Sequence, residues 1–126
     1  MTEFYQRQKR AQMVIEQIRV YRFPLPAQTT YNMSSSTVSL PQSTIVELID
    51  TSGMKGYGEA CLATPKAQSA SNDDVLAAMG VLAPSIIGLD PTDFSTVNAF
   101  MDASSAPLSE GKAALDIACW DLTGKK

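Results

Sequence analysis

The chain has 126 residues, a net charge of −3, and 44% hydrophobic and 18% charged residues, which is typical of one globular domain rather than a disordered segment. It has no histidine, and its two cysteines lack metal-ligand spacing, which excludes histidine triads and histidine metal sites and favours reduced, buried thiols. No apolar run approaches the about 20 residues of a membrane span and no nucleic-acid motif is present, so we expect a cytoplasmic protein that binds neither membrane nor nucleic acid.

The first half of the chain predicts a small antiparallel sheet. Residues 1–13 form a polar extension, and β-branched and aromatic residues then alternate until Pro24 and Pro26, which cannot donate to a sheet ladder. Gly53 allows a tight turn between two further apolar stretches. The predicted strands of this three-stranded meander are residues 14–23, 44–50 and 54–60.

Two long polar connections interrupt this part of the chain, at residues 28–43 and 62–71. The first is longer than a usual hairpin loop and has no sustained periodicity, and such loops are often functional or disordered. Because both leave the same small sheet, they are candidates for a lid over something outside the domain.

Three helices are predicted after the strands. Ser71 or Asn72 caps the first, which Pro84 ends or bends; Asp90-Pro91 starts the second, and Ser109 caps the third. Strands followed by helices indicate an α+β domain rather than alternating α/β. The buried stripe predicted for the second helix consists of Phe94, Val97 and Met101, with Phe100 beside them.

The third helix is apolar over most of its circumference, with Leu115, Cys119 and Leu122 on one of its apolar stripes. A helix of this kind is usually buried on several sides, yet the sequence ends soon after it. We therefore expect it to pack against a partner that the sequence does not contain, with Trp120 in a core or an interface.

No group of residues in the sequence is a candidate catalytic or metal site. The three glycines within residues 53–58 lie in a hairpin and do not open a helix, so they indicate turn geometry and close backbone approach rather than a phosphate-binding loop. Glu59 is expected to be partly buried, either paired structurally or at the edge of a ligand site. Asp116 and Asp121 point in different directions on one helix, which favours structural pairing or capping.

Five segments occur in a familiar order: Ile18-Arg19-Val20-Tyr21, Thr44-Ile45-Val46-Glu47-Leu48, Gly56-Tyr57-Gly58-Glu59-Ala60, LAPSIIGLDP at 82–91 and KAALDIACWDLTGK at 112–125. Together they resemble the N-terminal domain of the mandelate racemase and muconate lactonizing branch of the enolase superfamily. The resemblance covers residues 14–126, and the last segment is the most diagnostic. Leu108-Ser109-Glu110 stands where relatives commonly have a Gly-His pair, which leaves the substrate group open.

The resemblance implies a two-domain enzyme: an α+β capping domain followed by a (β/α)-barrel, which this sequence lacks. In the family, the barrel binds Mg²⁺ and supplies a lysine or histidine base that removes the proton next to a substrate carboxylate. The implied enzyme is a homo-oligomeric racemase or epimerase, cycloisomerase or dehydratase acting on a small carboxylate. The 126 residues alone are expected to be inactive.

In the family, the capping domain closes two loops over the barrel. By position these are residues 26–41 and 61–69, with Tyr31, Asn32 and Leu62 as candidate substrate contacts. The resemblance places no catalytic residue, metal ligand or cofactor site in this chain. The alternative is a freestanding α+β binding or interaction module without catalysis, which would be polar around Leu115, Cys119 and Leu122 instead of exposing apolar surface there.

Overall fold

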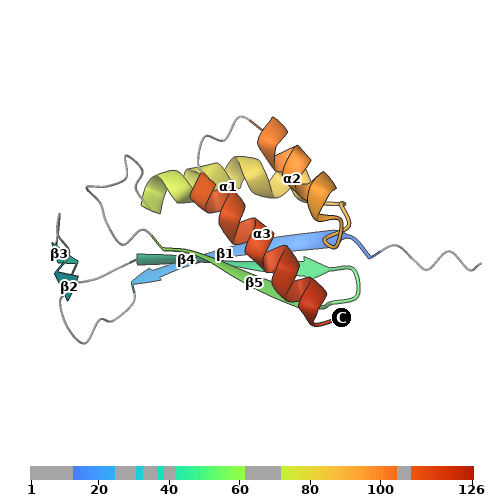
Figure 1. Ribbon diagram of the computed structural model, residues 1–126, viewed down its shortest axis with the longest axis horizontal. Helices are drawn as coiled ribbons and strands as arrows, with labels where there is room; N and C mark the ends of the chain where they lie inside the picture. The colour runs from blue at the N-terminus through green and yellow to red at the C-terminus, as the bar shows by residue number, and fades with distance from the viewer. Residues whose placement is uncertain (1–12, 25–30, 33–36, 39–41, 62–71, 105–108) are drawn as a thin grey trace, which may run out of the picture.

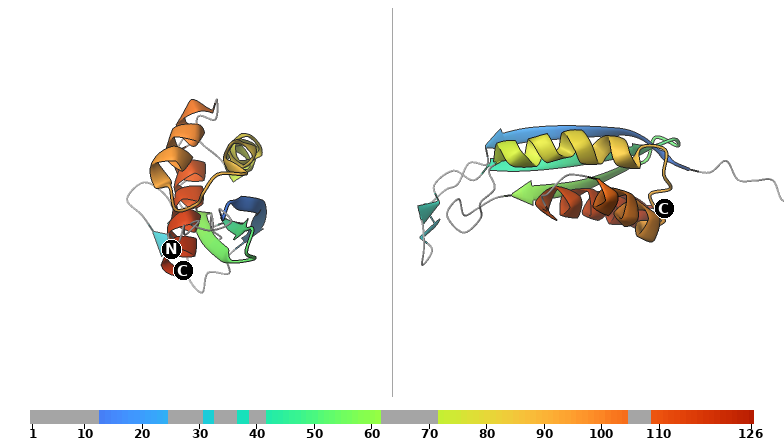
Figure 2. Two further views of the ribbon diagram at one scale, coloured as in Figure 1. Left: turned by 90° about the vertical axis from the view of Figure 1, so that its right-hand side faces the viewer. Right: turned by 90° about the horizontal axis from the view of Figure 1, so that it is seen from above.

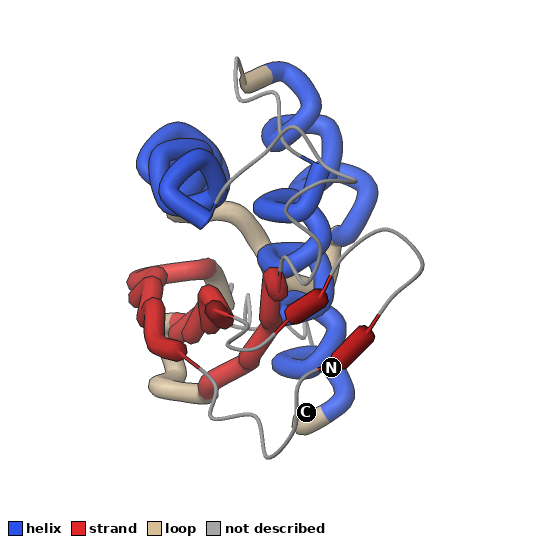
Figure 3. The backbone as a smooth tube through the Cα atoms, turned by 90° about the vertical axis from the view of Figure 1, so that its left-hand side faces the viewer, coloured by secondary structure: helices blue, strands red, loops and turns tan. Residues whose placement is uncertain are grey.

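The computed structural model describes residues 13–24, 31–32, 37–38, 42–61, 72–104 and 109–126. Figures 1 and 3 show the helices as a layer on one face of a small sheet. The predicted α+β class, with three sheet strands followed by three helices, is confirmed. The strands of this sheet are β1 (Ile15–Pro24), β4 (Gln42–Asp50) and β5 (Lys55–Cys61), and the helices are α1 (Asn72–Ile86), α2 (Phe94–Ala103) and α3 (Ser109–Gly124).

The sheet is an antiparallel meander in the order β1-β4-β5. Pro24 lies opposite Gln42 and Ser43 lies opposite Cys61, so β1 and β5 end where β4 begins. The connections that follow β1 and β5 therefore leave from one end of the sheet, which we call the loop end and which is on the left in Figure 1. At the opposite end, Gly53 has a φ of 84° in the predicted tight turn.

A short hairpin lies in the segment that the sequence predicts to lack regular structure. Strand β2 (Tyr31–Asn32) pairs antiparallel with β3 (Thr37–Val38). Figure 1 places this hairpin beyond the loop end of the main sheet. Strands of two residues carry too little alternation for a sequence pattern to reveal them.

Alternation along the strands divides the sheet into a face covered by helices and an outer face. Val46 faces the helices with Val20 and Gly58 as its cross-strand neighbours, whereas the next residue, Glu47, faces outward. Burial of the apolar side chains on the covered face supplies the main driving force for folding. The core consists of Ile15, Val46, Leu48, Ala60, Val75, Ala78, Met79, Leu82, Ile86, Val97, Met101, Ala114, Leu115, Ala118, Cys119 and Leu122.

The second helix begins later than predicted. Asp90 Oδ1 accepts hydrogen bonds from the N–H and the hydroxyl of Thr92, at 2.9 and 2.7 Å, and so forms a turn before the helix. Asp93 is the cap, because its side chain accepts from the Thr96 N–H at 3.1 Å. Val97 and Met101 are buried as predicted and Phe94 is partly buried, but Phe100 is exposed.

Helix α1 continues through Pro84 and ends at Ile86, so the proline does not end it. A proline this close to the C-terminus of a helix removes only one hydrogen bond from the last turn, which limits its effect. Within the described residues, no helix has the length and apolar character needed to cross a bilayer.

Candidate docking surface and lid region

Helix α3 lies directly on β5, with its backbone against two glycines. A Cβ atom at Gly58 would be 1.8 Å from the Ala114 carbonyl oxygen, and one at Gly56 would be 2.1 Å from the Ala118 carbonyl oxygen. A side chain at either position would displace the helix. Close backbone approach therefore requires these glycines, as predicted, and they are not a phosphate-binding loop.

Two charged residues near the end of α3 pair with the free edge of β5. Asp121 Oδ2 accepts from the Tyr57 N–H at 2.8 Å, and Lys125 Nζ donates to the Lys55 carbonyl oxygen at 3.1 Å. Lys125 also donates to Asp121 at 2.6 Å and lies 4.9 Å from the centroid of the Tyr57 ring. The Lys125 ammonium, with the Tyr57 N–H, holds the pKa of Asp121 below its usual range. These side chains satisfy backbone groups that an edge strand would otherwise leave open.

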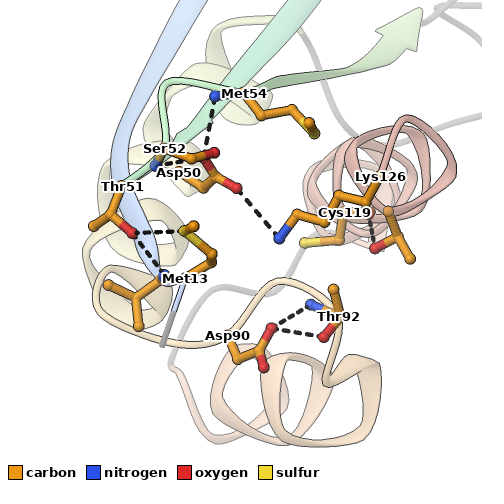
Figure 4. Close-up of polar contacts among 11 residues, drawn as sticks. Met13, Asp50, Thr51, Ser52, Met54, Asp90, Thr92, Cys119 and Lys126 are labelled. Carbon is orange, nitrogen blue, oxygen red and sulfur yellow. Dashed lines mark hydrogen bonds and ion pairs between the residues drawn. The ribbon is translucent and has the colours of Figure 1, made fainter. Parts of the chain in front are cut away.

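Buried Asp50 ties the turn between β4 and β5 to the end of α3 (Figure 4). Its Oδ1 accepts from the Ser52 N–H at 2.9 Å, the Ser52 hydroxyl at 2.5 Å and the Met54 N–H at 3.1 Å. Its Oδ2 is buried and lies 3.3 Å from its ion-pair partner, Lys126 Nζ. Burial raises the pKa of Asp50, but the hydrogen bonds and the ammonium outweigh it, so the pKa lies below its ordinary value.

Glu47 is buried on the outer face of the sheet because side chains from both edge strands cover it. The Tyr57 hydroxyl donates to Oε2 at 2.9 Å, and Lys55 Nζ is 3.4 Å from the same oxygen. Arg19 donates to Oε1 at 3.3 Å. The Tyr57 hydrogen bond, with the two cations, holds the pKa of Glu47 below its usual range. The carboxylate is thus a structural group that joins the three strands.

Two expectations for residues of β5 are wrong. Glu59 is exposed, where its carboxylate accepts from the Ser43 hydroxyl, and Cys61 is exposed rather than buried. The register of the strand explains both exposures. Every second residue of β5 faces the helices, and Glu59 and Cys61 are among the alternate residues that face away from them. Cys119 is buried as predicted, and burial raises the pKa of its thiol to about 12, so it stays protonated.

One side of α3 carries apolar side chains that the chain leaves exposed. The ring of Trp120 stacks on that of Phe94 from α2, with centroids 3.8 Å apart, yet Trp120 is 57% exposed. Ile117, about one turn earlier on α3, is 49% exposed. We call Phe94, Ile117 and Trp120 the α2–α3 strip. Exposed aromatic and aliphatic side chains of this kind are typical of surfaces that contact another protein or domain.

The apolar surface that α3 exposes is not the one that the sequence predicts. Leu115, Cys119 and Leu122 are fully buried within the chain. The small residues Ala114 and Ala118 meet the two glycines of β5, and this contact turns the neighbouring Leu–Cys–Leu stripe into the core. The apolar surface left exposed is therefore centred on the opposite side of the helix.

The predicted lid contacts lie at the loop end or outside the described residues. Tyr31 and Asn32 form β2, of which the structure describes the backbone pairing with β3. Leu62 lies outside the described residues. Contact of these three side chains with a substrate stays a prediction.

The described part of the chain contains no group of three or more histidine, cysteine, aspartate or glutamate residues placed to hold a metal ion. Asp116 accepts from Asn98 Nδ2 at 2.9 Å and so joins α3 to α2, while Asp121 is bound to β5. The two carboxylates thus serve separate structural contacts, as predicted. The described donors do not fit a magnesium site.

The described residues thus form an α+β domain in which the helices cover one face of a three-stranded sheet. The exposed α2–α3 strip and the two connections that start at one end of the sheet are its candidate contact regions. Residues 15–126 match the mandelate racemase / muconate lactonizing enzyme N-terminal domain. The chain belongs to this family, which confirms the resemblance and the fold of an enolase-superfamily capping domain.

Among curated relatives, the chain is 36% identical over 115 residues to a cis-3-hydroxy-L-proline dehydratase of Roseibium aggregatum, covering 90% of this chain and 31% of the relative. It is 32% identical over 117 residues to a hydrophobic dipeptide epimerase of Enterococcus faecalis, covering 90% and 32%. The solved dipeptide epimerase of Enterococcus faecalis, complexed with Mg and L-Leu-L-Tyr, matches with a TM-score of 0.83 and 30% identity, over 89% of this chain and 31% of that one. The chain thus spans about a third of the length of these relatives.

Proposed function

We propose that this chain caps the active site of a magnesium-dependent enolase-superfamily enzyme that removes the proton next to a carboxylate. The enzyme is a racemase or epimerase, a cycloisomerase or a dehydratase. The observation that carries this proposal is the match of nearly the whole chain to the first domain of relatives about three times its length. The proposed setting is cytoplasmic, within a homo-oligomer.

The partner of this chain is then the barrel that follows the domain in its relatives. The α2–α3 strip is the surface best suited to that contact, because Ile117 and Trp120 are exposed in the second half of α3, the helix after which the chain of the relatives continues. Burial of such side chains favours association in proportion to the apolar area removed from water. The Asp50–Lys126 ion pair would hold the start of that continuation against the sheet.

The loop end supplies the other part of the function. Both connections start at the same end of the sheet, and Tyr31, Asn32 and Leu62 are the proposed substrate contacts. Their role would be to exclude water and shape the pocket, since the reacting groups belong to the barrel. A magnesium ion held by the barrel would supply Lewis-acid stabilisation of the negative charge that develops on the substrate. Among the described residues of this chain, no group of three or more histidine, cysteine, aspartate or glutamate residues is placed to hold it.

Calorimetric titration with Mg²⁺ tests this division of roles. The chain alone is expected to give no stoichiometric heat of binding. A chimera in which residues 15–126 replace the matching part of the Roseibium dehydratase should bind Mg²⁺ and dehydrate its substrate. Tight magnesium binding by the chain alone would contradict the proposal.

A further inference from the structure

Two polar contacts cross the loop end of the sheet, one on each face. On the outer face, the hydroxyl of Ser43 in β4 donates to the carboxylate of Glu59 in β5. On the face that the helices cover, Arg22 of β1 donates to Asp73 in the first turn of α1. The second contact is possible because α1 begins at the loop end, as the right-hand view of Figure 2 also shows.

The positions of these four residues in the chain make each contact a link between the two connections. Arg22 lies just before the connection from β1 to β4, and Asp73 lies just after the connection from β5 to α1. Ser43 lies just after the first connection, and Glu59 lies just before the second. Each end of one connection is therefore tied to an end of the other.

We propose that Ser43–Glu59 and Arg22–Asp73 are positioning contacts for substrate binding. The inference rests on the proposed function, in which both connections contact the substrate. The four side chains act through the connections and not on the substrate itself. They fix the base from which the two connections start, so that both approach the substrate in one arrangement. Substrate then binds more tightly, because less freedom is lost on binding.

Burial makes the two contacts unequal. Ser43 is fully buried, so the loss of its acceptor would leave a buried hydroxyl without a partner, which is unfavourable. The side chain of Asp73 is 80% exposed, and an ion pair in contact with water contributes little. We therefore expect the Ser43–Glu59 contact to have the larger effect on substrate binding.

Steady-state kinetics of the chimera with the Roseibium dehydratase test the proposal. Ser43→Ala and Glu59→Ala should each raise the KM at least about fivefold. The kcat should stay within about twofold, because the reacting groups of the barrel are unchanged. The double variant should raise the KM no further than the larger single change, since both changes remove the same contact. Glu59→Gln, which keeps an acceptor oxygen, should restore the KM, and Asp73→Ala should raise it about twofold.

Thr44→Val is the matched control. Thr44 follows Ser43 on β4, and its buried hydroxyl has no hydrogen-bond partner among the described residues. The change removes a buried hydroxyl next to the contact but breaks no described hydrogen bond, so the KM and the kcat should stay within about twofold. Thermal melting by circular dichroism establishes that each variant is folded. A merely structural contact would lower the melting temperature and leave the KM unchanged well below it.

The outcomes separate this inference from the proposed function. An active chimera whose KM is unchanged in Ser43→Ala and Glu59→Ala would overturn the inference and leave the proposed function intact. An equal rise of the KM in Thr44→Val would overturn it as well. A parent chimera without activity would overturn the proposed function, and this inference with it.

Discussion

The contact of α3 with β5 and the outer side of α1 both contain glycine within a regular element, but the space beside the glycine differs. At Gly58 a helix backbone occupies the position of the missing side chain, whereas at Gly80 that position is open among the described residues. Glycine in a strand or helix is unfavourable by itself, so a filled contact offsets this cost within the chain and an open one does not. Gly58 lets α3 pack directly on β5, whereas Gly80 leaves an open position on the outer side of α1 among the described residues.

The largest expected effect is that of Gly58→Ala. The added methyl group would lie 1.8 Å from the Ala114 carbonyl oxygen, and no flexible side chain can move to relieve the clash. We expect a loss of about 3 kcal/mol or more in the free energy of unfolding. Urea denaturation followed by circular dichroism measures it, and a loss below about 1 kcal/mol would mean that α3 can shift away from β5 at little cost.

Asp50→Ala tests the turn that holds the end of α3. The change removes the acceptor of three hydrogen bonds and the partner of Lys126, so we expect a loss of about 2–4 kcal/mol. Lys126→Met is the control, since it leaves the three hydrogen bonds of the turn intact. It also leaves the buried Asp50 Oδ2 without its cation, so we expect a smaller loss of about 1–3 kcal/mol. Equal losses in the two variants would show that the ion pair, and not the turn, dominates.

Acid should weaken the fold because it protonates three aspartates that are hydrogen-bonded in the folded chain. The folded pKa values of Asp50, Asp93 and Asp121 lie below their ordinary values, so their contribution is present above the unfolded pKa and is lost as pH falls through it toward the folded value. We expect the urea midpoint to be nearly flat from about pH 6 to 8, because the chain has no histidine, and to fall below about pH 4. Asp50→Asn should make this decline shallower. A midpoint that rises on acidification would contradict the assignment.

The smallest effect, and the opposite sign, is expected for Gly80→Ala. Its Cβ would meet no described atom within 4 Å, so the change should add about 0.5–1 kcal/mol to the stability of the monomer through helix propensity alone. Urea denaturation of dilute samples, followed by circular dichroism, measures the free energy of unfolding of the monomer. A loss of stability would mean that the space beside Gly80 is occupied within the chain.

Local patterns in the sequence predict the sheet strands well, because alternation and the flanking prolines and Gly53 mark their limits. The start of α2 is harder, since Asp90 and Asp93 are both good caps and only the folded chain selects between a turn and a helix. The exposed side of α3 could not be predicted from its own apolar residues. It depends on the pairing of Ala114 and Ala118 with glycines more than fifty residues earlier, which is a tertiary contact.

The most direct test of the account uses Trp120, which is the only tryptophan of the chain. The chain is labelled with 5-fluorotryptophan, and its ¹⁹F signal is measured alone and after ligation to the unlabelled remainder of the Roseibium dehydratase. The account predicts a clear solvent isotope shift for the chain alone, since Trp120 is 57% exposed, and a much smaller shift after ligation. An equally large shift in a folded, ligated protein would contradict the claim that this side of α3 packs on the following domain.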